Sequence, residues 1–496
     1  MSSKWLIVSV AGLGWLDLKA RRMRRIAGLE FGAAKSAFPA VTCVAQASLR
    51  TGAKPQSHGM TSNGVFSREL RKAAFWEQSA ALVRGPRIWD AARAAGKTVG
   101  MYFWQQSLGE SIDSVISPAP IHKHHGGMIP KLYTQTPELA AALESTLGAF
   151  PMRLYWGPAA SPLVGDKVID FAKLAMEIED PDIAFVYLPT LDYDLQRHGS
   201  AAPTSDKSFE LIENQLWRLS ALAEKQEREM LVLGDYAITP ATVPPAFPNQ
   251  TLREIGYFKT RDVNGMAYPD LFASRAFALC DHEVAHVYIR DPADLEPVRL
   301  LLKRTGDYEN VRVNDCEQPW AHATGGELLL TATRGSWCAY PWWTNPREAP
   351  DYATHVDIHN KPGYDPCELF SGGIFPPRTS LDATLIRGTH GRESNVAFAT
   401  TKPLEGITAL SRPDEIGAAL EKIFTADATP PPPEPKSRAA RSGYSSIESL
   451  FPPSDPEPDS SPEPEPTPAP EPEPPLPTPH SPLPSLPPDE PDSPQT

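Results

Sequence analysis

The chain has 496 residues and a formal net charge of −14, but its prolines and charges are unevenly distributed. Residues 430–496 hold 25 of the 55 prolines and carry a net charge of −9, so the rest of the chain is close to neutral. A near-neutral body argues against binding to a nucleic-acid polymer, which needs concentrated positive charge. Five widely spaced cysteines without a CxxC pair argue against a disulfide framework and a cysteine zinc site.

Residues 1–425 alternate between short apolar runs rich in β-branched residues and longer segments with helical periodicity. In chain order the predicted elements are strand 5–10, helix 170–178, strand 183–188, helix 209–229, strand 230–233, strand 286–289, helix 296–304, strand 327–332 and helix 415–424. Runs that are apolar throughout are typical of strands covered on both faces. The alternation predicts an α/β domain with a largely parallel sheet, in which active residues gather at the carboxyl ends of strands.

No run of about 20 apolar residues occurs, so we expect no membrane span and a cytoplasmic protein. Residues 426–496 are predicted to be a disordered tail, because Pro-Glu repeats cannot bury a core and favour an extended, solvated backbone. Residues 441–451 interrupt this tail with aromatic residues and no proline. They are either a chance feature of a linker or a short docking motif for a protein partner.

The first segment with candidate chemistry is FPAVTC, in which Thr42 follows an extended stretch and precedes a predicted helix. A hydroxyl at that point meets the positive end of the helix dipole, and a neighbouring metal would lower its pKa further. Taken alone, a threonine there is typical of a helix cap. A glycine-containing loop follows and carries Asn63, whose amide can donate to an oxyanion. Cys43, beside the threonine, is interpreted as a small buried core residue.

Three further segments place acidic residues and a histidine after apolar runs. Asp192 follows the strand at 183–188, Asp235 follows the strand at 230–233, and His390 lies in a loop between Gly388 and Gly391. Carboxylates and histidines are ligands that suit zinc, although aspartates at strand ends also form turns.

Taken together, these four segments resemble the type I phosphodiesterase/nucleotide pyrophosphatase family of the alkaline phosphatase superfamily. The motifs FPAVTC, LDYDLQR, KPGYDP and GTHG are similar to those of a bacterial branch of that family. The resemblance implies a mixed, mainly parallel central sheet sandwiched by helices over residues 1–425, with an inserted cap subdomain at about 245–385. It also implies a small phosphorylated substrate and two divalent metal ions, usually zinc, with manganese or iron as alternatives.

The resemblance assigns a role to each matching residue. Thr42 corresponds to the nucleophile that attacks phosphorus, and Asn63 corresponds to a residue that binds the phosphoryl oxygens. Asp192 and His390 match ligands of one metal ion, and Asp235 matches a ligand of the other. Divalent ions would neutralise the phosphate, generate an alkoxide and hold the entering and leaving oxygens in line.

The chain departs from the family pattern at three positions that normally bind metal. Ala11 replaces an aspartate, Gln196 replaces a histidine, with His198 nearby, and Tyr236 replaces a second histidine. We considered replacement ligands at Asp357 and His359, which on a strand would point to one face and join Asp192 and His390 at a single metal site. The alternative is that Asp357 caps a turn and His359 packs against Tyr364.

Two other histidine groups are interpreted as structural. The segment 281–286 contains Asp281, His282 and His286, and a cluster at 122–125 is typical of a solvated loop. We therefore expect a metal-dependent hydrolase of phosphodiester, nucleotide pyrophosphate or related phosphate or phosphonate ester bonds. The alternative is a degenerate, non-catalytic family member that binds a phosphorylated ligand or a partner protein. The enzyme interpretation requires Asp192, Asp235 and His390 to lie close to the hydroxyl of Thr42.

Overall fold

A computed structural model of the chain describes residues 3–122, 128–315, 317–357, 360–373 and 378–427. The chain divides into two units, residues 1–433 and residues 434–496. All elements below belong to the first unit. His359, the histidines at 124 and 125, and the predicted docking motif at 441–451 lie outside the described residues.

The largest sheet among the described residues has eight strands in the order β11-β8-β7-β12-β1-β13-β24-β4. The five strands from β8 to β13 are parallel, whereas β11, β24 and β4 pair in antiparallel fashion. This mixed, mainly parallel sheet confirms the predicted fold class. The strands are β1 (Lys4–Val10), β4 (Gly32–Lys35), β7 (Val99–Tyr102), β8 (Ser114–Pro118), β11 (Leu132–Thr134), β12 (Ile183–Leu188), β13 (Arg228–Gly234) and β24 (Asn395–Thr400).

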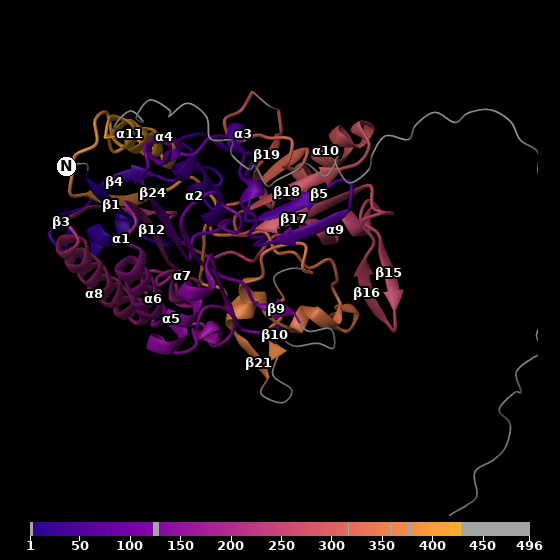
Figure 1. Cartoon of the computed structure of the whole chain (residues 1–496). Coiled ribbons are helices and arrows are strands. Elements are labelled where there is room, and N and C mark those ends of the chain that lie inside the picture. Colours follow the sequence, from indigo (N-terminus) through magenta and orange to yellow (C-terminus); the bar gives the residue numbers. More distant parts are fainter. Residues whose placement is uncertain (1–2, 123–127, 316, 358–359, 374–377, 428–496) are drawn as a thin grey trace, which may run out of the picture. The chain divides into compact units, whose positions relative to one another are not determined.

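Helices cover both faces of this sheet, which explains why β12 is buried along its whole length. Figure 1 shows α5, α6 and α8 on one side of the sheet and α2, α4 and α11 on the other. Helix α6 packs against α5 and α8, and α2 packs against α11. The helices are α2 (Thr42–Thr51), α4 (Asp90–Ala94), α5 (Pro137–Leu147), α6 (Val164–Glu179), α8 (Pro203–Lys225) and α11 (Pro413–Ala426).

A second, antiparallel sheet of four strands has the order β17-β18-β20-β19 and a hydrophobic core of its own. Helices α9 and α10 lie beside it in Figure 1. Its elements fall within the range 245–385, where the resemblance implies a cap subdomain, although Phe66 and Phe75 also contribute to its core. They are α9 (Pro248–Glu254), β17 (Ala276–Asp281), β18 (Val284–Ile289), α10 (Leu295–Thr305), β19 (Tyr308–Val313) and β20 (Leu328–Ala332).

Smaller elements complete the described part of the first unit. The remaining α-helices are α1 (Trp15–Ala20), α3 (Pro55–His58) and α7 (Asp192–His198). The two-stranded sheets are β2 (Arg25–Ile26) with β3 (Leu29–Glu30), β5 (Gly64–Ser67) with β6 (Lys72–Phe75), β9 (Ile121–His122) with β10 (Met128–Ile129), β14 (Thr239–Pro240) with β23 (Gly388–Thr389), β15 (Thr260–Val263) with β16 (Met266–Pro269), and β21 (Ser371–Gly373) with β22 (Arg378–Thr379). Within the described residues, every helix is too short or too polar to cross a bilayer.

The predicted elements are present, but several boundaries differ. Helices α6 and α8 begin at Val164 and Pro203, before the predicted starts at 170 and 209. The helix predicted over 209–229 ends at Lys225, and β13 begins at Arg228. Glu227 lies between them with φ +52, and such a left-handed residue cannot continue an α-helix. Periodicity missed this boundary because the segment remains polar and helix-favouring up to the turn.

Candidate active site

The parallel register of three neighbouring strands creates the site. Val10 at the end of β1 pairs with Leu188 at the end of β12 and with Gly234 at the end of β13. The residues that follow these strands therefore meet at one edge of the sheet, as expected for an α/β fold. This is how Asp192 and Asp235, 43 positions apart in the chain, come together.

Thr42 is the first residue of α2 and is buried. The cap position is Val41 in an extended conformation, and no side chain caps the helix. The interpretation of Thr42 as a helix cap is therefore wrong. Its hydroxyl instead donates to the Tyr236 hydroxyl, with the two oxygens 3.5 Å apart, at the long end of hydrogen-bond distances.

Tyr236 links the threonine to a carboxylate. Its hydroxyl donates to Asp192 Oδ1 at 3.0 Å, so a continuous chain of donors runs from Thr42 through Tyr236 to Asp192. Asp192 Oδ2 accepts a second hydrogen bond, at 2.8 Å, from Gln196 Nε2 one helical turn along α7. Gln196 Oε1 in turn accepts from the Tyr364 hydroxyl at 2.8 Å. The two residues that replace family histidines are thus joined in one hydrogen-bonded network, which we call the Tyr236 network (Thr42, Tyr236, Asp192, Gln196 and Tyr364).

His390 closes one side of the Tyr236 network. Its ring is stacked on Tyr236, with centroids 3.5 Å apart and an interplanar angle of 5°. The His282 ring lies against it at 3.5 Å and also stacks on Tyr364 at 3.8 Å. His390 Nδ1 lies 2.8 Å from the Ala40 carbonyl, which assigns the ring proton to that nitrogen. Burial lowers the pKa of His390 to about 3, so the ring is neutral at pH 7.

Asn63 lies beside the start of α2, as the sequence predicted. Its Oδ1 accepts from the Cys43 backbone N–H at 3.0 Å, which ties the loop to the first turn of the helix. Its Nδ2 and its backbone N–H both donate to Asp281, at 3.1 and 2.7 Å. Ser62 adds a third hydrogen bond to this carboxylate at 2.8 Å. Asp281 therefore positions Asn63, a role that sequence reasoning missed because the two residues are 218 positions apart.

Asp235 is buried at the end of β13, where Ser9 donates to its Oδ1. Its Oδ2 has no hydrogen-bond partner, which is an unfavourable state for a buried carboxylate oxygen. Burial raises the pKa of Asp235 to about 7, and it raises the pKa of Asp192 to about 6 despite the hydrogen bonds from Gln196 and Tyr236. At neutral pH the two carboxylates therefore sit close to their titration range.

Asp357 does not lie on a strand. The segment after the short 3₁₀ helix Asp351–Thr354 is irregular, and both carboxylate oxygens of Asp357 accept hydrogen bonds from Asn360, at 2.9 and 2.7 Å. The carboxylate caps this turn, as the alternative interpretation held. Because His359 lies outside the described residues, its proposed contacts are not placed.

The residues present do not fit the two-metal centre that the family implies. Within the described part of the chain, no group of three or more His, Cys, Asp or Glu side chains is arranged to hold a metal ion. Asp192, His390 and Asp357 form no such group among the described residues, and His359, the fourth member of the predicted set, lies outside them. Tyr236 and Gln196 are not usual zinc ligands, and burial keeps the pKa of Tyr236 well above its ordinary value, so its phenol keeps its proton. Asp235 Oδ2 is a carboxylate oxygen without a hydrogen-bond partner here, but a single such oxygen does not make a metal site.

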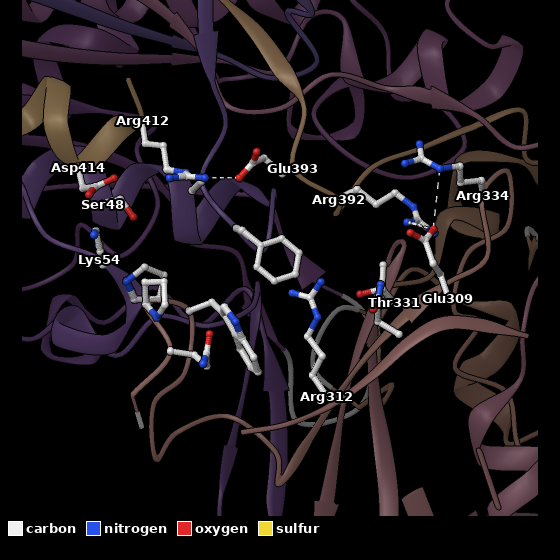
Figure 2. Close-up of a pocket in the computed structure, with 17 residues that line it drawn as sticks. Ser48, Lys54, Glu309, Arg312, Thr331, Arg334, Arg392, Glu393, Arg412 and Asp414 are labelled. Carbon is white, nitrogen blue, oxygen red and sulfur yellow. Dashed lines mark hydrogen bonds and ion pairs between the residues drawn. The ribbon is translucent and has the colours of Figure 1, made fainter. Parts of the chain in front are cut away.

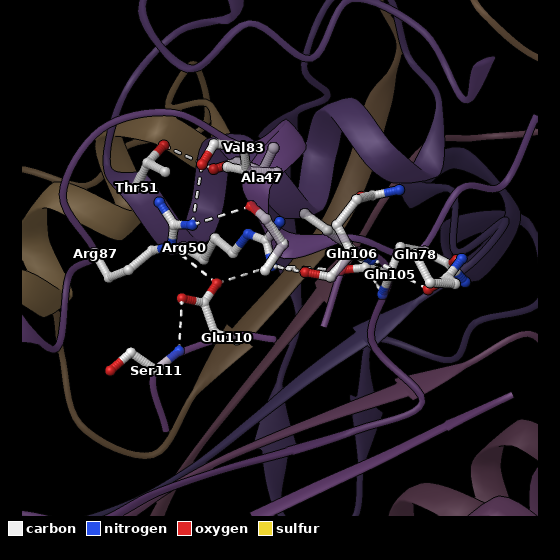
Figure 3. Close-up of polar contacts among 12 residues, drawn as sticks. Ala47, Arg50, Thr51, Gln78, Val83, Arg87, Gln105, Gln106, Glu110 and Ser111 are labelled. Atoms are coloured by element: carbon white, nitrogen blue, oxygen red, sulfur yellow. Dashed lines mark hydrogen bonds and ion pairs between the residues drawn. The ribbon is translucent and has the colours of Figure 1, made fainter. Parts of the chain in front are cut away.

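A separate polar cluster holds α2 in place, as Figure 3 shows. Arg50, in the last turn of the helix, is fully buried and donates to the Gln106 carbonyl at 2.8 Å. It also faces Glu110 at 3.5 Å, which pairs with Arg87 at 2.9 Å. A cation at a helix C-terminus is favoured by the helix dipole, although burial lowers the pKa of Arg50 to about 10. The cluster anchors the far end of the helix whose first residue is Thr42.

A family model described as type I phosphodiesterase/nucleotide pyrophosphatase matches residues 5–365. The chain belongs to this family. Membership places it among the phosphoesterase-type hydrolases, which typically depend on divalent metals. The match ends at Asp365, within the motif KPGYDP, so it includes Thr42, Asp192 and Asp235 but not His390.

Solved structures share the fold at low sequence identity. One is phosphonoacetate hydrolase from Sinorhizobium meliloti 1021 in complex with phosphonoacetate, with 14% identity and a TM-score of 0.52. Another is murine ectonucleotide pyrophosphatase/phosphodiesterase 5, an inactive variant in complex with AMP, also with 14% identity and a TM-score of 0.52. Each comparison covers 86% of this chain and 96% of the other. No protein with a curated description matches the chain.

Proposed function

We propose that this family member hydrolyses a small phosphate or phosphonate ester with Thr42 as the nucleophile, activated by Tyr236 and Asp192. The observation that carries the proposal is the donor chain from the Thr42 hydroxyl through the Tyr236 hydroxyl to the Asp192 carboxylate. A nucleophile within hydrogen-bond reach of a group that a third residue orients is the arrangement expected for covalent catalysis. The phosphonate and nucleotide ligands of the two similar structures support this substrate class.

The proposed reaction has two steps. Thr42 Oγ attacks phosphorus while its proton passes to Tyr236 and the Tyr236 proton passes to Asp192. The bond from phosphorus to the leaving-group oxygen breaks, and this oxygen takes up a proton from solvent, which regains one from the attacking water of the second step. Water then cleaves the phosphothreonine bond, which restores the Thr42 hydroxyl and releases the phosphate or phosphonate product. Asp192 acts as the base of the first step and as the acid that returns the proton.

Charge on the phosphoryl oxygens would be met by the start of α2 and by Asn63. Backbone N–H groups and the dipole of a ten-residue helix favour an anion at that end. Asn63 donates one of its two amide protons to Asp281, which leaves the second for an oxygen of the substrate. Asp281 is therefore a positioning residue for Asn63.

The proposal assigns no step to zinc, manganese or iron. Metal activation of Thr42 would need ligands that Ala11, Gln196 and Tyr236 do not supply. The Tyr236 hydroxyl is the group that lies within hydrogen-bond reach of the Thr42 hydroxyl. The protein-derived proton path replaces that activation.

The test is hydrolysis of bis-p-nitrophenyl phosphate and of a p-nitrophenyl phosphonate ester by the purified full chain. We expect Thr42→Ala to abolish turnover, Thr42→Ser to retain part of it, and overnight chelator treatment to leave the rate unchanged. Mass spectrometry of acid-quenched enzyme should find a phosphorylated peptide containing Thr42. Full activity in Thr42→Ala would refute the nucleophile, and loss in chelator with recovery in zinc would refute metal-independent activation.

A second function, binding of a phosphorylated ligand without turnover, is favoured by one observation. Both oxygens of Asp192 already accept hydrogen bonds from the residues that replace the family histidines, so the Tyr236 network is complete without substrate. Under this alternative, ligand binding persists while neither p-nitrophenolate release nor a phosphorylated Thr42 is detected in the wild-type chain.

A further inference from the structure

A cavity of about 480 Å³ lies away from the Tyr236 network and is lined by five cations. Its walls come from the segment before α2, the loop before α3, strands β19 and β20, and the start of α11, and none of the Tyr236 network residues lines it. Figure 2 shows Lys54 and Arg412 on one side and Arg312, Arg334 and Arg392 on the other. We call this cavity the arginine pocket.

The carboxylates of the arginine pocket do not neutralise all of its cations. Glu309 pairs with Arg392 at 2.7 Å and more distantly with Arg334 at 3.9 Å, and Glu393 pairs with Arg412. The third carboxylate is Asp414, which faces the charge of Lys54. The lining thus has five cations and three carboxylates, an excess of two positive charges.

Arg312 is the cation most available to a ligand. Its guanidinium lies over the Phe38 ring at 5.5 Å and has no carboxylate within 4.0 Å in the part of the chain that is described. The Phe38 ring meets Trp320 edge-on at 6.3 Å, so an aromatic wall adjoins the cation. A guanidinium of this kind binds phosphate oxygens through parallel N–H donors.

An unsatisfied hydroxyl in the same wall points to a missing partner. Thr331, on β20, is 3% exposed, lines the arginine pocket, and its Oγ1 has no hydrogen-bond partner. Buried polar atoms are nearly always paired, so an orphaned one at the wall of a charged cavity indicates a ligand atom. Figure 2 places Thr331 between Arg312 and Glu309.

We propose that the arginine pocket binds a small phosphomonoester with a planar organic group. The excess of two positive charges matches the −1.5 to −2 charge of a phosphomonoester at neutral pH. Arg312 would contact the phosphate, Thr331 would hydrogen-bond an oxygen, and Phe38 and Trp320 would contact the organic group. The site does not depend on the chemistry of Thr42.

The test is isothermal titration of the full chain with phenyl phosphate, inorganic phosphate and phenol, in the Thr42→Ala background to prevent turnover. We expect phenyl phosphate to bind more tightly than phosphate, and phenol not to bind measurably. Arg312→Gln should weaken phenyl phosphate by about tenfold or more, whereas Arg304→Gln, an exposed arginine on α10 outside the pocket, should not.

Thr331→Val separates binding from folding. Because its hydroxyl has no partner, the variant should unfold at the same temperature or higher, while its affinity for phenyl phosphate falls about three- to tenfold. Binding at the Tyr236 network is the competing outcome. Unchanged affinity in both Arg312→Gln and Thr331→Val, together with loss of binding in Tyr236→Phe, would overturn the proposal.

Discussion

We propose that the Tyr236 network and the arginine pocket both bind a phosphorylated ligand, but their polar and charged groups are paired to different extents. In the first, the buried carboxylate of Asp192 is paired with neutral donors, and both positions of lost histidine ligands are filled by groups that hydrogen-bond to it. In the second, cations outnumber carboxylates and a buried hydroxyl is unpaired. The comparison shows that the loss of metal ligands need not leave Asp192 without hydrogen-bond partners. The excess positive charge lies instead in the arginine pocket.

The largest expected effect comes from recreating the metal ligands. Tyr236→His with Gln196→His should replace the two neutral donors with ligands, and adding Ala11→Asp should complete the second site. We expect the wild type to retain no stoichiometric zinc after dialysis and the triple variant to retain at least one ion per chain, measured by elemental analysis.

Circular dichroism would show whether the triple variant folds, because Ala11 is fully buried and a new carboxylate there is costly without metal. If the triple variant does not fold, zinc retention is measured on the double variant Tyr236→His with Gln196→His, which lacks the buried carboxylate. Stoichiometric zinc in the wild type would contradict the conclusion that the residues of the Tyr236 network do not hold a metal ion.

The second-largest effect is expected from removing Arg50, which anchors α2, and it is a loss of stability. Arg50→Met leaves Glu110 buried with Arg87 as its remaining cation, and breaking a buried pair typically costs about 3–5 kcal/mol. Arg312→Gln, which breaks no ion pair, should change the free energy of unfolding by less than about 0.5 kcal/mol. Urea denaturation of both variants measures the contrast, and equal losses would contradict it.

Tyr236→Phe removes the hydroxyl that joins Thr42 to Asp192 but keeps the ring that stacks on His390. We expect the turnover rate to fall about 10²-fold, the usual size of a general acid–base contribution, while phenyl phosphate binding in the arginine pocket is unchanged. Steady-state kinetics and titration calorimetry on the same preparation provide the two readouts. An unchanged rate would remove Tyr236 from the proton path.

We expect the difference in stability between the wild type and Asp281→Asn to depend on pH. Burial raises its pKa to about 6, against about 3.9 in an unfolded chain. The folded protein therefore holds a proton that the unfolded chain releases between about pH 4 and 6, and this carboxyl contributes less stability as the pH rises through that window. Asp281→Asn should accordingly gain stability relative to the wild type from pH 4 to 7, by at most about 3 kcal/mol. Thermal unfolding across this range measures the gain, and a difference independent of pH would contradict it.

The smallest expected effect concerns Cys43, beside Thr42. Burial raises the pKa of its thiol to about 12, so almost no thiolate is present at pH 8. Iodoacetamide should leave Cys43 unmodified in the folded chain and label it in urea, as peptide mapping would show. Rapid labelling of the folded chain would indicate that the site is open to solvent.

Local sequence determined the elements and the position of Thr42 at the start of a helix. The apolar run at 183–188 became a buried strand with the predicted bounds, and Thr42 begins a helix as its context predicted. These features depend on residues close in the chain, where periodicity and turn chemistry act directly. The family resemblance added Asn63, Asp192, Asp235 and His390, which motif spacing alone would have left among turn formers.

Tertiary structure alone decided what the departures mean. In the sequence, Gln196 and Tyr236 stand only as replacements for metal-binding histidines. In the fold, both donate hydrogen bonds to Asp192, because strand register brings the ends of β12 and β13 together. The support of Asn63 by Asp281 also depends on two residues 218 positions apart in the chain, and Arg312 has no ion-pair partner among the described residues that pack around it. Local patterns encode which residues form an element, but a hydrogen bond or a net charge within a cavity depends on every segment that packs around it.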